Sequence, residues 1–333
     1  MDISNASRGR IVVITGASSG IGRATAMAFA QRGWRLALAA RRMDVLEEVA
    51  KECEQAGGKA IAVATDVIDL ESVQALAQKA KQDFGGVDVW VNNAGTGMFG
   101  PYTDVPFKLH RRTIEVDLLG AMHGAYAALP VFIHQGYGTL INNISIGAWC
   151  STPYTAAYTA SKFGLRGFAS SLRQELLKWP NIHICGVFPS MVDTPGLEHG
   201  ANFSGHQISA GPFVYAPEEV AKTIVDLAVN PRDEVAVGWP ARAAQIAYTV
   251  ARRPTEWAMG TVMRMLLSIT ESAQPYEGAL MQPVHQGATA SGGWRKRYSV
   301  PSASVITRIS LAVMAGAVLL LGISSACRSP QKR

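Results

Sequence analysis

A tyrosine, a lysine and a serine in this chain have the spacing of a proton-transfer site. Tyr158 and Lys162 stand four residues apart, which on a helix places both side chains on one face, about one turn from each other. A fixed ammonium beside a phenol favours the phenolate form. Ser145 ends an apolar run thirteen residues before the tyrosine, and its hydroxyl can hydrogen-bond the same reacting oxygen. The three side chains predict general acid–base chemistry, although the Tyr-x-x-x-Lys spacing alone arises by chance in many helices.

A glycine-rich turn near the N-terminus supplies a second chemical feature. An apolar run at 10–14 leads into the sequence TGASSGIG at 15–22, and an apolar helical segment follows at 24–31. Glycines between a strand and a helix permit a tight turn and the close approach of a diphosphate, and the helix N-terminus offers free N–H donors. Such a turn alone would equally suit a structural loop. With the proton-transfer residues downstream, we interpret it as a dinucleotide site made by Thr15, Gly16, Ser18, Ser19, Gly20, Ile21 and Gly22.

The order of these motifs resembles that of the short-chain dehydrogenase/reductase family. The chain carries TGxxxGxG at 15–22, Asn-Asn-Ala-Gly at 92–95, Ser145, and then Tyr158 with Lys162, so the resemblance covers roughly residues 8–240. It implies one Rossmann-type domain that holds both cofactor and catalytic residues. By this resemblance Tyr158 is the general acid/base, Ser145 orients the substrate oxygen, and Lys162 binds the nicotinamide ribose and makes the tyrosine more acidic.

The resemblance also implies further cofactor contacts. The motif at 92–95 would lie beside the adenine ring and the central sheet, and the pair at 66–67 would contact the adenine. The stretch 189–194 is similar to the family's Pro-Gly motif, whose threonine contacts the nicotinamide amide, but Ser190 stands here in place of the glycine. The residues implied are Asp66, Val67, Asn93, Ala94, Gly95, Pro189, Val192 and Thr194.

One residue departs from the family's catalytic pattern. The family usually has an asparagine in a V-N-L-x-G stretch, and here the stretch 116–120 carries Asp117 instead. That asparagine commonly holds a water of the proton relay. Aspartate is nearly isosteric and accepts hydrogen bonds, but it donates none unless protonated, and its charge would lie near Lys162. Two outcomes stay open: a relay with altered pH dependence, which we favour because the other motifs are intact, or a slower enzyme.

The residues after the second strand indicate which dinucleotide binds. The segment 35–40 ends at Ala40 without the acidic residue that would bind a ribose 2′-hydroxyl and favour NAD. Arg41 and Arg42 follow, and the planar fork of arginine suits a 2′-phosphate. We therefore expect NADP(H), with NAD(H) less favoured. The alternative is that both arginines are solvated residues at the start of a helix over 43–55.

Alternating strands and helical segments predict an α/β fold. With 333 residues, 48% of them hydrophobic, the chain can bury a substantial core. The alternation continues to about residue 240, which predicts a Rossmann-type doubly wound parallel sheet with a C-terminal helical extension. The seven expected strands are Ile11–Thr15, Arg35–Ala40, Ala60–Ala64, Val87–Val91, Thr139–Ile144, Ile182–Val187 and Glu234–Val237.

The composition predicts four regions of different character. Residues 1–245 form the catalytic and cofactor-binding domain, 246–290 a helical extension, 291–308 a basic linker and 309–326 a possible transmembrane helix. The net charge is +6, but residues 291–333 hold seven Lys or Arg and no acid, so +6 less 7 leaves −1 for residues 1–290. We therefore expect no nucleic-acid binding by the catalytic domain. No metal is expected, because the histidines and four scattered cysteines lack ligand spacing.

The tail predicts attachment to a membrane. Residues 309–326 are eighteen residues without a charge, close to the shortest length that spans a bilayer. Basic residues flank this segment, and Trp294 and Tyr298 would suit the membrane interface. We expect a single C-terminal span with the catalytic domain in the cytoplasm; the alternative is a buried packing or dimer-interface helix. The N-terminal ten residues are polar, and we expect no signal peptide there.

Two further segments bear on the substrate and on assembly. Helical patterns at 241–250 and 255–269, broken at 252–254, would cover the substrate cleft, mediate oligomer contacts or rest on a membrane, and core packing is the commonest fate of such stripes. The loop 191–215 contains three aromatic residues and only two acids, which favours a mostly apolar alcohol or ketone. The family resemblance implies homo-oligomers built through the helices near Tyr158 and Met122.

The motifs together predict an NADP(H)-dependent oxidoreductase acting on a carbonyl or secondary alcohol. A competing hypothesis is a membrane-anchored dinucleotide-binding scaffold or sensor, with catalysis weakened because Asp117 replaces the usual asparagine. A third hypothesis, an epimerase or dehydratase of the wider superfamily, is disfavoured because those enzymes usually have a different glycine spacing and a longer substrate domain.

Overall fold

Seven parallel strands form one sheet in the computed structural model, which describes residues 9–210, 214–284 and 287–297. The strand order is β3-β2-β1-β4-β6-β7-β9. Their bounds are β1 Ile11–Thr15, β2 Arg35–Ala40, β3 Lys59–Ala64, β4 Val89–Asn92, β6 Gly138–Asn143, β7 Ile182–Pro189 and β9 Glu234–Val237. All seven expected strands are confirmed, with ends shifted by no more than two residues.

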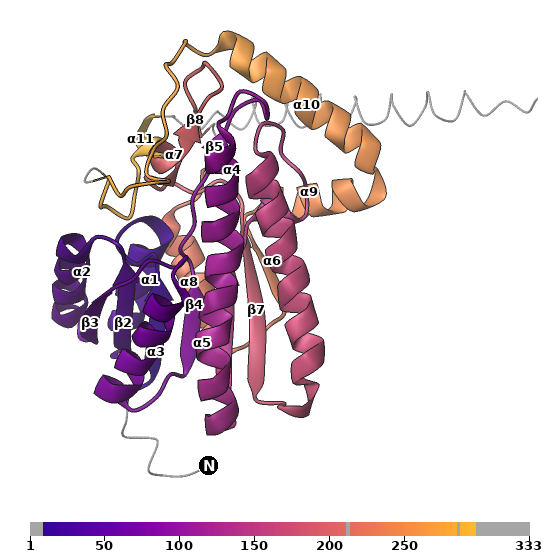
Figure 1. Cartoon of the computed structure of the whole chain (residues 1–333). Coiled ribbons are helices and arrows are strands. Elements are labelled where there is room, and N and C mark those ends of the chain that lie inside the picture. Colours follow the sequence, from indigo (N-terminus) through magenta and orange to yellow (C-terminus); the bar gives the residue numbers. More distant parts are fainter. Residues whose placement is uncertain (1–8, 211–213, 285–286, 298–333) are drawn as a thin grey trace, which may run out of the picture.

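Helices cover both faces of the sheet, which explains why its inner strands are continuous apolar runs (Figure 1). Helices α1, α2 and α8 pack on one face, and α3, α5 and α6 on the other. The α-helices are α1 Gly20–Ala30, α2 Met43–Gln55, α3 Leu70–Phe84, α4 Phe107–Ile114, α5 Gly120–Gln135, α6 Ala156–Glu175, α7 Gly196–His199, α8 Pro217–Val229, α9 Trp239–Val250, α10 Arg252–Ile269 and α11 Trp294–Arg297. The predicted doubly wound α/β fold with a helical extension is therefore present.

The strand order reverses beside β1, and this reversal locates the site. β1 pairs with β2 on one side and with β4 on the other. Connections after β1 and β4 therefore leave in opposite directions and open a crevice at the carboxyl ends of the strands. The glycine-rich turn follows β1, the motif 92–95 follows β4, and Ser145 follows β6. One edge of the sheet thus gathers motifs that are far apart in the sequence.

A second, two-stranded sheet has no signature in the sequence. β5 (Met98–Phe99) pairs with β8 (Ala201–Asn202) in parallel. Two residues are too few to show a strand period, and about a hundred residues separate the partners. The pair places Met98 and Phe99 at the rim of the site.

The extension beyond β9 differs from the favoured expectation of core packing. In α10 no residue is buried, and in α9 only Ala241 is. The break between the two helices lies at Ala251, which has φ −139°, and not at 252–254. Pro254 is accommodated in the first turn of α10, where its missing N–H would have no intrahelical partner.

The described part of the tail also differs from a free linker. The backbone N–H of Trp294 donates to Asp193 at 2.7 Å, and the indole is 6% exposed. Its expected place at a membrane interface is therefore wrong. Tyr298 and the proposed span 309–326 lie outside the described residues. Among those described, the continuous helical stretch Phe107–Gln135 is long and apolar enough to cross a membrane, but it packs on the sheet as a core helix.

Candidate active site

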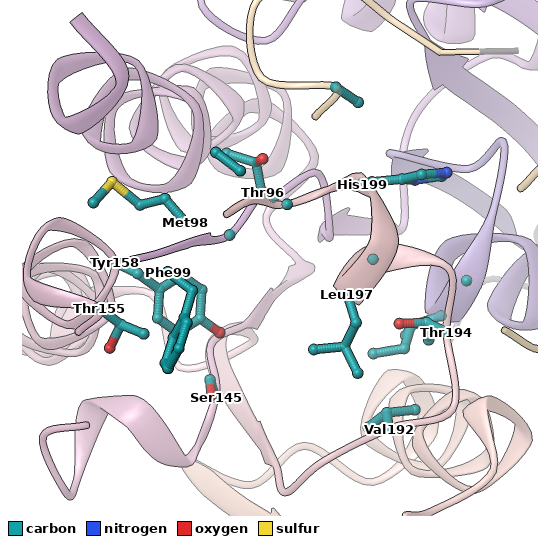
Figure 2. Close-up of a pocket in the computed structure, with 18 of the residues that line it drawn as sticks. Thr96, Met98, Phe99, Ser145, Thr155, Tyr158, Val192, Thr194, Leu197 and His199 are labelled. Carbon is teal, nitrogen blue, oxygen red and sulfur yellow. The ribbon is translucent and has the colours of Figure 1, made fainter. Parts of the chain in front are cut away.

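A cavity of about 960 Å³ lies at the carboxyl ends of the strands. Its volume is near the upper end of the range for cofactor sites, about 300–1,000 Å³. In the close-up, Ser145, Tyr158 and Phe99 lie on one wall, and Leu197 and Thr194 lie on the facing wall (Figure 2). The space suits a large ligand together with a smaller one.

Helix α6 carries the tyrosine and the lysine on one face. Lys162 Nζ lies 5.4 Å from the centre of the Tyr158 ring, as the four-residue spacing requires. Tyr158 lines the cavity, while Lys162 reaches it from a buried position and is 5% exposed. The positive charge of Lys162 therefore faces the ring of Tyr158.

Ser145 is held in an unusual backbone conformation beside the tyrosine. Its φ is 144° and its ψ is 158°, a backbone conformation that residues other than glycine rarely adopt. Its Oγ accepts a hydrogen bond from the Gly147 N–H at 3.1 Å, which fixes the side chain at the start of a short 3₁₀ turn, Ile146–Ala148. A Cβ on Gly147 would lie 3.3 Å from Tyr158 Cε1. Glycine at 147 therefore allows the serine and the tyrosine to approach each other.

Asp117 lies behind the lysine in a π-helical turn, Glu115–Leu119, between α4 and α5. Such turns recur at functional sites because the extra residue breaks the helical hydrogen-bond ladder. Asp117 Oδ1 accepts the Thr96 N–H at 2.7 Å. Its Oδ2 is 3.6 Å from Lys162 Nζ, an ion-pair distance too long for a hydrogen bond. The expected closeness of this carboxyl to Lys162 is therefore present.

Burial dominates the electrostatics of Asp117. Burial raises the pKa of its carboxyl above the ordinary value, and Lys162 and the Thr96 N–H oppose that rise only in part. Oδ2 has no hydrogen-bond partner among the described residues. A carboxyl with a raised pKa holds its proton to higher pH, and in that form it can donate as the usual asparagine does.

The glycine-rich turn forms the opposite end of the cavity. Gly20 begins α1 with φ +56°, which glycine adopts without strain. Thr15 Oγ1 accepts the N–H groups of Asn93 and Ala94 at 3.0 and 3.1 Å. Thr15 therefore joins the turn to the end of β4. A Cβ on Gly22 would lie 2.1 Å from the Gly16 carbonyl oxygen, so Gly22 serves close packing inside the turn.

Two arginines follow β2 and face the same end. Arg42 Nη2 donates to Ser18 Oγ at 3.3 Å and Nη1 to the Val284 carbonyl at 2.8 Å. Arg41 Nη2 donates to the Ala279 carbonyl at 2.8 Å. Burial lowers the pKa of both guanidinium groups, with Asp66 opposing the effect at Arg41. Arg42, whose cofactor role the sequence left open, is thus bonded to the turn through Ser18.

Most of the predicted site residues meet in this one cavity, and three do not line it. Asp117 stands behind Lys162, and Thr15 and Gly22 lie within the frame of the turn. The predicted residues that line the cavity are Gly16, Ser18, Ser19, Gly20, Ile21, Arg41, Asp66, Val67, Asn93, Ala94, Gly95, Ser145, Tyr158, Lys162, Pro189, Val192 and Thr194.

These residues fit a dinucleotide. The cavity is long enough to join the turn at one end to Ser145 and Tyr158 at the other. The start of α1 offers backbone donors for a diphosphate. Guanidinium groups and the Ser18 hydroxyl stand together beside the turn, a donor set that suits a phosphate on the ribose.

Other lining residues had no clear signal in the sequence. Helix α10 contributes Met263, Leu266 and Leu267, and the segment after it contributes Ala279 and Val284. The sequence showed a stripe of apolar residues on α10, but such a stripe is the same whether it lines a cavity or packs in the core. The aromatic residues expected from the loop 191–215 lie elsewhere. Phe203 packs beside Met98 in a separate cluster, and Tyr215 accepts the Trp239 N–H; Phe213 is outside the described residues.

Comparison with known proteins gives consistent similarities. Residues 10–202 match the short chain dehydrogenase family. The uncharacterized oxidoreductase YxnA of Bacillus subtilis is 32% identical over 93% of this chain and 89% of its own length. An alcohol dehydrogenase from Thermococcus sibiricus, solved with 5-hydroxy-NADP, is 31% identical with a TM-score of 0.60, over 68% of this chain and 95% of that one. A metagenomic short-chain oxidoreductase solved with NADP is 31% identical, TM-score 0.59, over 69% and 96%.

We predict that Asp117→Asn gains stability relative to the unchanged protein as the pH rises. Because burial raises the pKa of Asp117 above 3.8, the folded protein holds a proton that the unfolded chain releases between 3.8 and the folded-state pKa. The stabilising contribution of this carboxyl is therefore present at low pH and lost as the pH rises through its folded-state pKa. Asparagine does not titrate.

Urea unfolding at a series of pH values from about 4 to about 7.5 measures this effect. The free energy of unfolding of the variant minus that of the unchanged protein should increase across this range. A difference that stays constant with pH would contradict the raised pKa.

Proposed function

This chain belongs to the short-chain dehydrogenase/reductase family, and on that premise we propose that it is an NADP(H)-dependent oxidoreductase with a mostly apolar carbonyl or alcohol substrate. The observation that carries the proposal is the single cavity shared by Ser145, Tyr158 and Lys162 at one end and by the glycine-rich turn with Arg41 at the other. Proton-transfer groups and phosphate-binding groups at two ends of one cavity are what hydride transfer to a carbonyl requires.

Each catalytic residue has a definable part in carbonyl reduction. The bound nicotinamide would supply the hydride to the carbonyl carbon. Tyr158 donates its hydroxyl proton to the oxygen as negative charge develops there, and Ser145 donates a hydrogen bond to the same oxygen. Lys162 stabilises the phenolate left on Tyr158. In alcohol oxidation the phenolate accepts the hydroxyl proton.

The preference for NADP(H) is supported by the end of β2. The strand ends at Ala40, which has no carboxylate; Arg41 and Arg42 follow, and Arg42 donates to Ser18 Oγ. Two similar solved structures were determined with NADP or 5-hydroxy-NADP. In this proposal Arg41 and Arg42 bind the 2′-phosphate.

An apolar substrate is supported by the side chains that line the catalytic end. Met98 and Phe99 lie near Tyr158 and Leu197 lies on the facing wall (Figure 2), and Met263 and Leu267 of α10 also line the cavity. No lysine or arginine other than Lys162 lines this end among the described residues. A charged substrate would therefore lack a partner for its charge.

The scaffold or sensor alternative rests on Asp117 alone. A carboxylate 3.6 Å from Lys162 would partly cancel the charge that supports Tyr158. Burial raises the pKa of Asp117, which widens the pH range in which the carboxyl is neutral and cancels none of the charge of Lys162.

The exposed helix α10 supports attachment of this enzyme to a membrane. Val262, Met265 and Ile269 are 53%, 64% and 75% exposed along one stripe. Residues 239–269 contain four arginines and one glutamate, a charge that favours anionic headgroups. Together with the uncharged segment 309–326, this surface supports a catalytic domain held against the cytoplasmic leaflet.

We predict that Tyr158→Phe loses turnover at least about 100-fold while it still binds NADPH. The variant removes the proton donor and leaves the ring packing unchanged. The measurement is NADPH oxidation with a panel of apolar ketones and aldehydes, beside NADPH binding by fluorescence. Tyr126→Phe is the matched control, because Tyr126 is an exposed tyrosine on α5. Unchanged turnover in Tyr158→Phe would refute the assignment.

We predict that Arg41→Ala lowers kcat/KM for NADPH by about 10- to 100-fold and changes that for NADH much less, because only NADPH carries the 2′-phosphate. Steady-state kinetics with both cofactors measures the ratio, and Arg32→Ala, at an exposed position, is the control. If kcat/KM of the unsubstituted protein were as high with NADH as with NADPH, the cofactor assignment would be refuted.

We predict that the full chain sediments with vesicles containing phosphatidylserine and that deletion of residues 300–333 releases it to the supernatant. The deletion removes the uncharged segment and keeps the whole described structure. A deleted protein that still sediments as completely as the full chain would contradict the anchor.

A further inference from the structure

The chain beyond α10 returns across the dinucleotide end of the cavity. We call its two described stretches, 276–284 and 287–294, the strap; in Figure 1 they belong to the orange and yellow trace that leads from α10 back toward α7. Ala279, Leu280, Pro283 and Val284 of the strap line the cavity itself.

Backbone carbonyls of the strap accept hydrogen bonds from the groups that surround the dinucleotide end. The Ala279 and Val284 carbonyls each accept one N–H from Arg41 and Arg42, both at 2.8 Å. The Leu280 carbonyl accepts from Arg112 at 3.2 Å. Further bonds run from Arg23 to the Ala288 carbonyl at 2.6 Å and from the Gly20 N–H to the Thr289 carbonyl at 3.0 Å.

The other side of the strap is fastened to the loop after β7. Tyr276 and Asn202 exchange two backbone hydrogen bonds of 2.9 Å, and the Ala279 N–H donates to the His199 carbonyl at 2.7 Å. Ser291 Oγ and the Trp294 N–H each donate to one carboxylate oxygen of Asp193 at 2.7 Å. The strap is therefore bonded on both sides of the cavity mouth.

Glycines in the strap make this close seating possible. A Cβ on Gly278, whose φ is +60°, would lie 2.2 Å from the His199 carbonyl oxygen. A Cβ on Gly292 would lie 2.5 Å from the Thr194 carbonyl oxygen. These neighbours are backbone atoms, which cannot move aside as a flexible side chain can.

The cavity measures about 960 Å³ with the strap in place and has strap residues in its lining, so the strap bounds the space and does not fill it. A guanidinium has five N–H donors. One N–H donor of Arg41 and one of Arg42 bond to strap carbonyls. These bonds orient both guanidinium groups and leave their other donors for a phosphate. A fixed guanidinium loses less conformational entropy when it binds.

We propose that the strap is the outer wall of the dinucleotide site: it aims Arg41 and Arg42 at the 2′-phosphate and closes over the bound cofactor, which leaves only when the strap detaches. This inference rests on the proposed function and adds to it the element that sets cofactor retention and part of the NADP(H) preference. Ala279 and Val284 act as positioning residues through their carbonyls.

The test uses Gly278→Val and Gly292→Val in the full chain, since both collide with backbone where the strap is seated. Gly260→Val is the matched control, because a Cβ at Gly260 meets no atom within 4 Å. NADPH release is followed by stopped-flow fluorescence, and dissociation constants are measured for NADPH and NADH. Hydrogen exchange of the amide of Gly20 reports strap seating without any cofactor.

We expect NADPH release on the order of tenfold faster in both strap variants, a smaller effect on NADH, and faster exchange at Gly20. Release at the unchanged rate despite faster exchange at Gly20 would overturn the inference and leave the proposed function standing. Tighter NADPH binding in the variants would also overturn it, because the strap would then be a competitor of the cofactor. Failure of the unchanged protein to bind NADPH would remove the proposed function and this inference together.

Discussion

The side chain of Asn93 joins the two halves of the site. Its Nδ2 donates to the carbonyls of Thr15 and Gly16 at 3.0 and 3.2 Å, and its Oδ1 accepts from Asn143 at 2.9 Å. The first pair fixes the glycine-rich turn after β1, and the third bond fixes the end of β6, two residues before Ser145. These three hydrogen bonds set the separation of the glycine-rich turn from Ser145.

A buried charge imposes the second constraint. Asp117 and Lys162 are 1% and 5% exposed, and their attraction offsets only part of the cost of removing a carboxylate from water. The π-helical turn brings Asp117 toward the Thr96 N–H, which supplies a further partner. The position usually held by a neutral asparagine in the family is thus occupied by a buried carboxyl 3.6 Å from Lys162 Nζ.

The sequence was sufficient to predict those parts of the fold and the site that depend on the type of side chain. Apolar runs located all seven strands, and the spacing from Tyr158 to Lys162 placed both on α6. It was insufficient where the backbone carries the contact. The strap binds Arg41 through the Ala279 carbonyl, and every residue has a carbonyl. Likewise β5 and β8 are too short to show a period, and α10 has an apolar stripe like that of a core helix although none of its residues is buried.

The walls of the cavity come from two parts of the chain with different relations to the family. The floor, with Ser145, Tyr158 and the glycine-rich turn, lies within residues 10–202, which match the family model. The outer walls come from α10 and the strap, which lie beyond that match. In the proposed function, proton transfer depends on the floor, whose geometry is fixed by the sheet. In the same proposal, substrate fit and cofactor release depend on the outer walls, so related chains with the same floor would differ in both. The similarity to YxnA covers 93% of this chain and so includes most residues beyond 202, which makes a comparison with that relative informative about the walls.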